Sequence, residues 1–141
     1  MKKVIIAMFM ALTTVGYAQQ ELLEIQKTLD RYIEGTSYNK PEMIRSAFYE
    51  DADLFLSKKG QELFILKPDT YAAPFGKKQQ GTFNGRTGKV LDISLANNIA
   101  IARAEIYIEE GNLRFVDLFL LKKLSGEWKI ISKAATLVTT P

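Results

Sequence analysis

The residue of this sequence best suited to acid–base chemistry or ligand binding is Asp117, which stands among bulky apolar residues. Phe115, Asp117, Phe119 and Leu121 alternate along one run, so in a strand they would share one face. A carboxyl group in such surroundings has a raised pKa unless a cation pairs with it. Asp117 could therefore be a general acid or the polar anchor of a ligand pocket. It could equally be a structural acid bonded to a backbone amide or to a cross-strand cation such as Arg103, or it could lie at a dimer interface.

Two tyrosines are candidates for the same site. Tyr32 and Tyr49 fall on segments predicted to be helical and to line the interior. A buried tyrosine needs a partner for its hydroxyl, and a ligand can supply one. The alternative is that both are ordinary core aromatics. We predict a ligand-binding set with Asp117 as the best catalytic candidate, made of Tyr32, Tyr49, Phe115, Asp117 and Phe119.

The residue types that are absent exclude several chemistries. The chain has no cysteine and no histidine, so it has no disulfide, no thiol nucleophile and no histidine-based catalytic triad. A zinc site would need carboxylates alone, and we expect neither a metal nor a cofactor. Acid–base chemistry would fall to Asp, Glu, Tyr or Lys with shifted pKa values.

The N-terminus has the three-part pattern of a signal peptide. Lys2 and Lys3 precede an apolar run over residues 4–15, and Gly16-Tyr17-Ala18 offers a cleavage site after Ala18. The apolar run is shorter than the roughly 20 residues that span a bilayer. We predict a signal peptide over residues 1–18 and export to the periplasm or the cell exterior, with no membrane association after cleavage.

The mature chain, residues 19–141, is predicted to be a single domain. Loss of Lys2 and Lys3 lowers the formal net charge from +3 to +1. A nearly neutral domain has no electrostatic footprint for nucleic acid, and we expect no such partner.

Two helices are predicted ahead of the strands. Apolar residues recur at helical spacing from Leu22 to Ile33, and Gly35 ends the run. Asn39 has the position of an N-cap for a second helix, whose apolar stripe runs from Met43 to Phe48. We expect Glu50-Asp51-Ala52-Asp53 to close this helix.

The rest of the chain is predicted to be mainly strand. A hairpin around residues 57–61 precedes a brief helical turn, 68–75, and a mobile, glycine-spaced loop, 76–89. Lys77, Lys78 and Arg86 could make this loop a lid or an anion site, but it lacks phosphate-loop spacing and we interpret it as solvated. Short turns then join strands over 90–95, 99–108, 113–124 and 128–137. Helices followed by an antiparallel meander indicate an α+β fold, with the helices on one face of the sheet.

Several segments, in order and spacing, resemble a known family over nearly the whole mature chain. They are 32–35, 43–49, 89–94, 100–105, 115–123 and 126–130. The sequence resembles the putative lumazine-binding, SnoaL-like branch of the nuclear transport factor 2-like superfamily. The resemblance implies a cystatin-like fold, in which a curved antiparallel sheet wraps round the N-terminal helices into a cone with an internal pocket, often as a dimer. It implies no shared reaction, because this fold hosts isomerases, dehydratases and pure binders.

The sequence departs from the family pattern where a histidine usually follows the Ala-Phe pair, since Tyr49 stands there. Three functions remain open. We favour a binder of a small apolar or heterocyclic molecule. The first alternative is a histidine-free isomerase or dehydratase that uses Asp117 with Tyr32 or Tyr49. The second is a dimeric interaction module whose outer sheet face, with Arg103 and Glu105, meets a second subunit.

Overall fold

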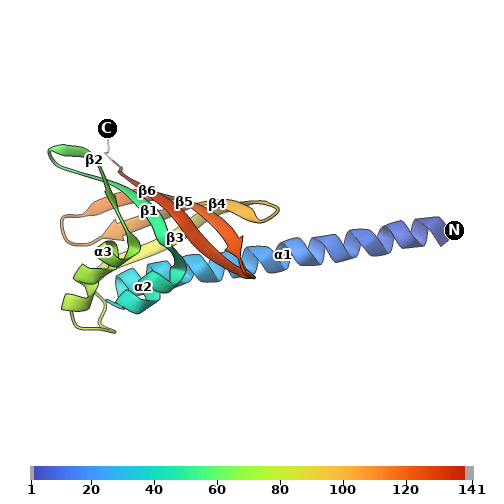
Figure 1. The fold of residues 1–141 in the computed structure, drawn as a ribbon, viewed down its shortest axis with the longest axis horizontal. Coiled ribbons are helices and arrows are strands. Elements are labelled where there is room, and N and C mark those ends of the chain that lie inside the picture. The colour runs from blue at the N-terminus through green and yellow to red at the C-terminus, as the bar shows by residue number, and fades with distance from the viewer. Residues whose placement is uncertain (1, 139–141) are drawn as a thin grey trace.

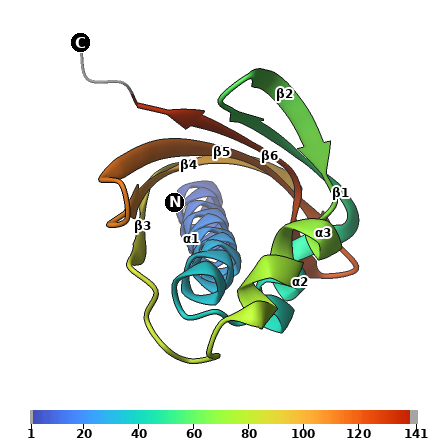
Figure 2. The ribbon, with the colours of Figure 1, turned by 90° about the vertical axis from the view of Figure 1, so that its left-hand side faces the viewer.

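The long N-terminal helix lies along the concave side of one curved, six-stranded sheet in the computed structural model (Figures 1 and 2). The model describes residues 2–138, with side chains from residue 16 onward. The helices are α1 (Lys2–Ser37), α2 (Pro41–Ala47), α3 (Pro68–Ala72) and the 3-10 helix η1 (Ala73–Lys77). The strands are β1 (Phe48–Lys58), β2 (Gln61–Leu66), β3 (Arg86–Ala96), β4 (Ile99–Ile108), β5 (Leu113–Leu124) and β6 (Glu127–Leu137). The predicted α+β class and the curved sheet around the helices are confirmed.

The order of strands in the sheet is β2-β1-β6-β5-β4-β3. Strands β3 to β6 form the predicted antiparallel meander. Strand β1 pairs in parallel with β6, which local patterns do not predict because the two strands are far apart in the chain. Strand β2 returns antiparallel at the edge, so the hairpin predicted around residues 57–61 is confirmed.

A β-bulge in β6 changes which residues face the helices. Ile130 pairs with Leu121, and Ser132 pairs with Leu120, so Ile131 is an extra residue in the ladder. An extra residue reverses the alternation of side chains beyond it. Lys133 is consequently buried on the same side of the sheet as Ile130, with only 2% of its surface exposed.

A second bulge, in β3, has the same effect. Val90 pairs with Ala104 while Asp92 pairs with Arg103, so Leu91 is the extra residue and is exposed. Before the bulge, even-numbered residues face the helices; after it, odd-numbered residues do. Arg86, the first residue of β3, belongs to the inward set.

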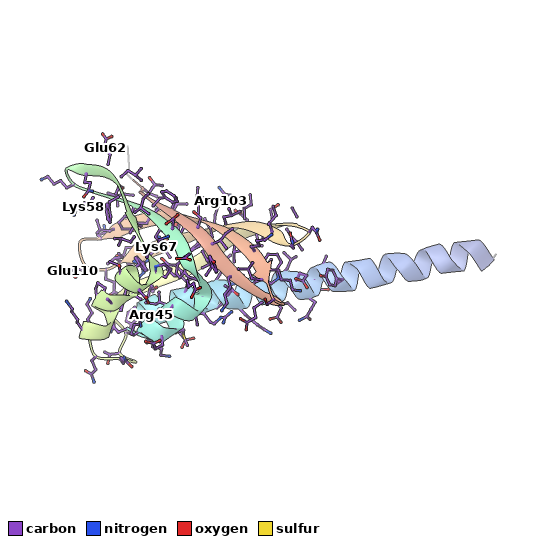
Figure 3. The ribbon with its side chains drawn as sticks, in the orientation of Figure 1. Arg45, Lys58, Glu62, Lys67, Arg103 and Glu110 are labelled. Carbon is purple, nitrogen blue, oxygen red and sulfur yellow. The ribbon has the colours of Figure 1, made fainter. Side chains whose placement is uncertain are left out.

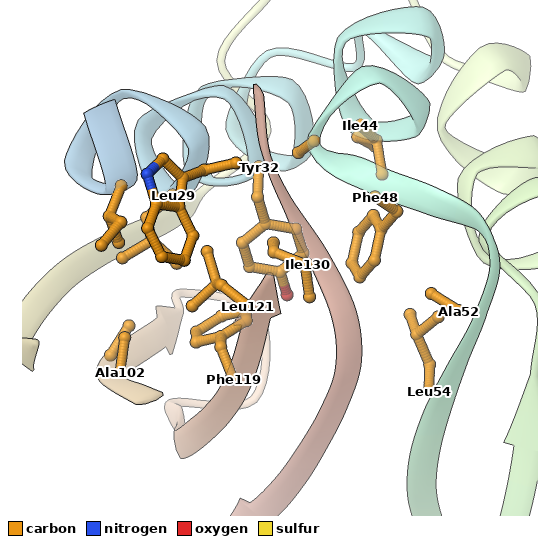
Figure 4. Close-up of a cluster of buried hydrophobic side chains, with 14 of the residues drawn as sticks. Leu29, Tyr32, Ile44, Phe48, Ala52, Leu54, Ala102, Phe119, Leu121 and Ile130 are labelled. Carbon is orange, nitrogen blue, oxygen red and sulfur yellow. The ribbon is translucent and has the colours of Figure 1, made fainter. Parts of the chain in front are cut away.

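The core lies between α1 and the inner face of the sheet (Figure 4). The ring of Tyr32 meets Phe48 and Phe119 edge-on, with ring centroids 5.8 and 5.3 Å away. The alanines of β4 face inward and leave room for the helix; the buried ones are Ala100, Ala102 and Ala104. Residue 35 has room only for glycine, because a Cβ there would lie 2.8 Å from a side-chain carbon of Ile44.

The predicted end of the second helix is wrong. Helix α2 ends at Ala47, and residues 48–58 form β1, so Glu50–Asp53 extends as strand instead of closing a helix. Ala52 and Leu54 are buried while Asp53 between them is not, which is the two-residue period of a strand. Pairing with β6 and β2 supplies hydrogen bonds that outweigh the local helical pattern.

The predicted N-cap at Asn39 is also wrong. Lys40 occupies the N-cap position without a side-chain cap, and Asn39 has a positive φ of 57°. The side-chain amide of Asn39 instead donates to the carbonyl oxygens of Gln79 and Thr82, at 3.0 Å each. Asn84 adds a 2.7 Å bond to the carbonyl oxygen of Thr36, so the glycine-spaced loop is tied to the end of α1.

Among the side chains described, from residue 16 onward, Glu21 is the first in α1 that is buried, since residues 16–20 are all exposed. The N-terminal half of α1 extends beyond the sheet (Figure 1). Glu21 accepts hydrogen bonds from Lys123 at 2.6 Å and from the indole nitrogen of Trp128 at 2.7 Å. The described residues, 2–138, include no helix long and apolar enough to cross a bilayer.

Replacing Glu21 with glutamine is expected to lower stability at neutral pH by roughly 1–3 kcal/mol, because a charged acceptor for Lys123 and Trp128 is lost. The hydrogen bond from Lys123 holds the pKa of Glu21 below its ordinary value, although burial opposes it. A lowered folded-state pKa means that the contribution is present above the unfolded pKa and disappears as the pH falls through the folded one. Melting temperatures of both proteins should therefore converge in acid.

The matched control is Glu24→Gln, one turn along the helix, whose partner Lys27 is mostly exposed. It should change the melting temperature little at any pH. A gap between wild type and Glu21→Gln that stays constant down to strongly acidic pH would contradict the role given to this carboxylate.

Candidate functional site

The hydroxyl of Tyr32 is the centre of a buried polar cluster inside the cone. It donates to Asp117 Oδ2 at 2.8 Å and accepts from Arg86 Nη2 at 3.0 Å. It also lies 3.1 Å from the hydroxyl of Tyr71. Because Tyr32 uses its only hydroxyl hydrogen in the bond to Asp117, Tyr71 is the donor in the hydrogen bond between the two tyrosines. Helices α1 and α3 and strands β3 and β5 thus meet at one oxygen atom.

Asp117 has a second partner, Lys133, whose ammonium lies 3.0 Å from the same Oδ2 atom. Both side chains are only 2% exposed. The ammonium also lies over the rings of Tyr32 and Tyr71, 5.7 Å from each centroid. Cation–π attraction of this kind is stronger when the cation is desolvated. The cross-strand cation is therefore Lys133, and the suggested partner Arg103 pairs with Asp92 on the other face of the sheet.

Arg86 adds a second cation to the cluster. Burial alone would lower the pKa of Arg86, but Tyr71, Tyr32 and Asp117 outweigh burial and raise it, so the guanidinium is charged. Its Nε atom is shielded from solvent and has no hydrogen-bond partner among the described residues. Two buried or partly buried cations therefore share one carboxylate, and the cluster has an excess of positive charge.

Tyr32 is held in its neutral form. Burial, reinforced by the Asp117 carboxylate, raises the pKa of Tyr32 well above its ordinary value. A phenol with a raised pKa keeps its proton and acts as a hydrogen-bond donor. That donor is already used by Asp117, so Tyr32 orders the carboxylate and offers no proton to a ligand.

A pocket of about 160 Å³ adjoins this cluster. Its polar wall is made by Tyr71, Arg86, Asp117 and Lys133, with Ser57 at the side. The other lining residues are apolar: Leu56, Phe64, Ile108, Phe115 and Ala135. Apolar walls with a few convergent polar groups are typical of small-molecule sites.

The structure separates the five predicted ligand-binding residues. Asp117 and Phe115 line the pocket. Tyr32 and Phe119 are buried behind it, in the core. Tyr49 lies on β1 and not on a helix, and 39% of its surface is exposed, so its predicted place with Tyr32 is wrong. The helix ends two residues before Tyr49, and the strand turns this side chain outward.

Sequence patterns missed three residues of the polar wall. Lys133 is turned inward only by the bulge at Ile131, which no local pattern marks. Arg86 was placed in a solvated loop, but it begins β3 opposite Ile108. Tyr71 lies on the helical turn that was predicted, and its aromatic ring was the one available signal.

The outer face of the sheet carries a separate apolar patch. Three large side chains there are 38–59% exposed: Ile101, Leu118 and Leu120. They border a groove of about 430 Å³ that also includes Asp92 and Arg103. Arg103 lies on the side of the sheet away from α1 (Figure 3), and the salt bridges Arg103–Asp92 and Arg114–Glu105 frame the patch.

The acidic residues do not gather into a cation site. Among the described residues, no three Asp or Glu side chains are close enough together to hold a metal ion. Asp51 and Asp53 lie near Lys67, which binds the carbonyl oxygen of the first and the carboxylate of the second.

Solved structures of similar fold come from several bacteria. A nuclear transport factor 2-like protein of unknown function from Shewanella baltica has a TM-score of 0.74 and 22% identity, covering 86% of this chain and 96% of that one. One from Methylobacillus flagellatus has a TM-score of 0.70 and 27% identity, covering 85% and 94%. A cystatin-like domain of unknown function from Nostoc punctiforme has a TM-score of 0.65 and 19% identity, covering 87% and 79%. No curated protein matches the sequence of this chain.

The family model described as "Putative lumazine-binding" matches residues 20–134. This span begins one residue before the buried Glu21 of α1 and ends one residue after Lys133. It thus includes every residue of the polar cluster. The chain belongs to the putative lumazine-binding family and has the nuclear transport factor 2-like fold.

Proposed function

We propose that this protein is exported and binds one small molecule, mostly apolar or heterocyclic, in the pocket beside the Tyr32 cluster. The observation that carries the proposal is the lining of the pocket, which combines apolar side chains with Tyr71, Arg86, Asp117 and Lys133. The volume of about 160 Å³ is below the roughly 300–1,000 Å³ of drug-sized sites. The ligand is therefore small, and the family description favours a heterocycle.

Binding is favoured over catalysis by the state of the tyrosines. An isomerase or dehydratase built on Asp117 would need a tyrosine free to donate to the reacting oxygen. Tyr32 already donates its hydrogen bond to Asp117, and Tyr49 is on the surface. Asp117 itself is engaged by both Lys133 and Tyr32 inside the protein, as a structural acid would be.

Export is proposed from the N-terminal sequence pattern. It is supported by the exposure of residues 16–18, the part of the predicted signal peptide whose side chains are described, and by a family match that begins at residue 20. Cleavage would also remove Tyr17, whose ring lies 5.8 Å from the ammonium of Lys123. The N-terminal residue of the protein recovered after export tests this: Gln19 is expected, and an intact Met1 would contradict it.

A second function, assembly of a homodimer, is favoured by the outer apolar patch. Monomeric proteins seldom expose contiguous large apolar side chains without a binding role. The two flanking salt bridges would give such an interface a polar rim. A dimer through this face would leave the pocket on the inner face accessible.

Asp117→Asn and Lys133→Met should each destabilise the fold by roughly 3–5 kcal/mol, because each leaves a buried charge without its partner. Asp117→Asn should cost more. It leaves both Lys133 and Arg86 uncompensated, whereas Lys133→Met leaves Arg86 to balance Asp117. Urea unfolding of both variants measures the order, and an unchanged or higher stability of Asp117→Asn would contradict the ion pair.

A ligand of the pocket, at a concentration of 100 times its Kd, should add about 2.7 kcal/mol to the free energy of unfolding. The melting temperature should rise accordingly. The experiment is a thermal-shift screen with lumazine and with small aromatic and heteroaromatic compounds. Ala135→Leu fills the pocket and should abolish the shift. The same change at the exposed Ala96, outside the pocket, should preserve it. A flat screen, or a shift that survives Ala135→Leu, argues against the proposed site.

Dimerisation through the outer face predicts a mass in solution of twice that of the chain. Ile101→Asp, in the centre of the patch, should reduce it to the mass of a monomer. Leu63→Asp changes a side chain of similar exposure on β2 and should leave the dimer intact. Light scattering after gel filtration measures the mass, and a wild-type monomer rules out this interface.

A further inference from the structure

The polar wall of the pocket has more positive than negative charge. Arg86 and Lys133 are its cations, and Asp117 is its only carboxylate. The remaining lining residues are uncharged at neutral pH. An unbalanced charge away from water is costly, and proteins normally pair or neutralise it. Here the arrangement of residues leaves one positive charge without a counterpart.

The hydrogen-bond inventory of Arg86 gives a second, independent sign of a missing partner. A guanidinium has five N–H donors. Within the described part of the chain, only Nη2 finds acceptors, the hydroxyls of Tyr32 at 3.0 Å and Tyr71 at 3.4 Å. Nε is shielded from solvent and unbonded. A buried donor left unsatisfied is uncommon in native proteins and usually has a reason.

Lys133 is likewise only partly satisfied. Its three N–H donors have one anionic acceptor, Asp117 Oδ2, and two aromatic rings. Asp117 is at the same time the acceptor for Tyr32. Asp117 Oδ2 thus accepts from the hydroxyl of Tyr32 and contacts the ammonium of Lys133. Asp117 has no direct hydrogen bond with Arg86 among the described contacts.

We propose that the ligand of this pocket is a small organic anion, with a carboxylate or an equivalent acidic group that binds Arg86 and Lys133. This inference rests on the proposed function, since it names the chemical class that the same pocket takes. The anion supplies the missing negative charge and accepts from the free guanidinium donors, in the bidentate manner that suits arginine. The body of the ligand lies against the apolar wall, beside Phe64 and Phe115.

The available volume restricts the class further. The volume of about 160 Å³ is well below the roughly 300–1,000 Å³ of drug-sized sites. This suits one ring with one acidic group and is too small for a nucleotide. Phosphate-loop geometry is not involved, because the donors are side chains from β3 and β6.

The test compares two matched pairs of compounds, benzoate with benzamide and furan-2-carboxylate with furan-2-carboxamide. The members of each pair have similar size and differ in charge. Binding to the wild-type protein is followed by nitrogen-15 NMR, including the Nε–H signal of Arg86. We expect each carboxylate to bind at least about tenfold more tightly than its amide and to shift that signal.

Arg86→Met should remove this preference, and Arg114→Met, which changes the arginine next to Phe115 on the opposite face, should retain it. The wild-type Nε–H shift keeps the test decisive even if Arg86→Met does not fold. If acid and amide bind equally and Ala135→Leu blocks both, the pocket is a binding site but its ligand is not selected for negative charge. If neither carboxylate binds, the proposal of an anionic ligand is wrong. If the neutral compounds also fail to bind, the proposed function is wrong as well.

Discussion

The hydroxyl of Tyr32 is the point at which the hydrogen bonds of the buried polar cluster meet. Through it the first helix is bonded to Asp117 on β5, to Arg86 on β3 and to Tyr71 on α3. The ring of Tyr32 packs at the same time between Phe48 and Phe119. A side chain that is apolar along its length and polar at its tip can join a hydrocarbon core to a polar cluster. The rest of the site depends on this junction because it fixes the carboxylate that orders the cations.

The polar cluster is stable only as a set. Asp117 and Lys133 are almost fully buried and Arg86 is partly buried, so removing one leaves another without compensation, and the energies of the members are not independent. The aromatic rings contribute directly, because Lys133 lies over two of them. The lining of the pocket thus combines a lysine and an arginine with a single acid, which makes the pocket electropositive.

The sheet has two faces with different roles, and the bulges decide which residue belongs to which. On the inner face, small alanines on β4 allow α1 to approach, and Lys133 is carried inward beyond the bulge at Ile131. On the outer face, apolar side chains remain uncovered and salt bridges surround them. One extra residue in a strand therefore supplies the pocket with a cation in β6 and leaves Leu91 exposed in β3.

Local patterns in the sequence determined most elements of the fold and the set of residues that share a strand face with Asp117. The shared face follows from the two-residue period of a strand, since β5 pairs with β4 in one regular register. Tertiary structure alone decided which charges come together. Lys133, 16 residues after Asp117, pairs with it, and Arg86, 31 residues before it, joins the cluster through Tyr32. Their direction depends on bulges and on pairing between distant segments, and a strand's own sequence specifies its period but not its register. Tyr49 was misplaced for the related reason that pairing with β6 converted the end of a predicted helix into strand.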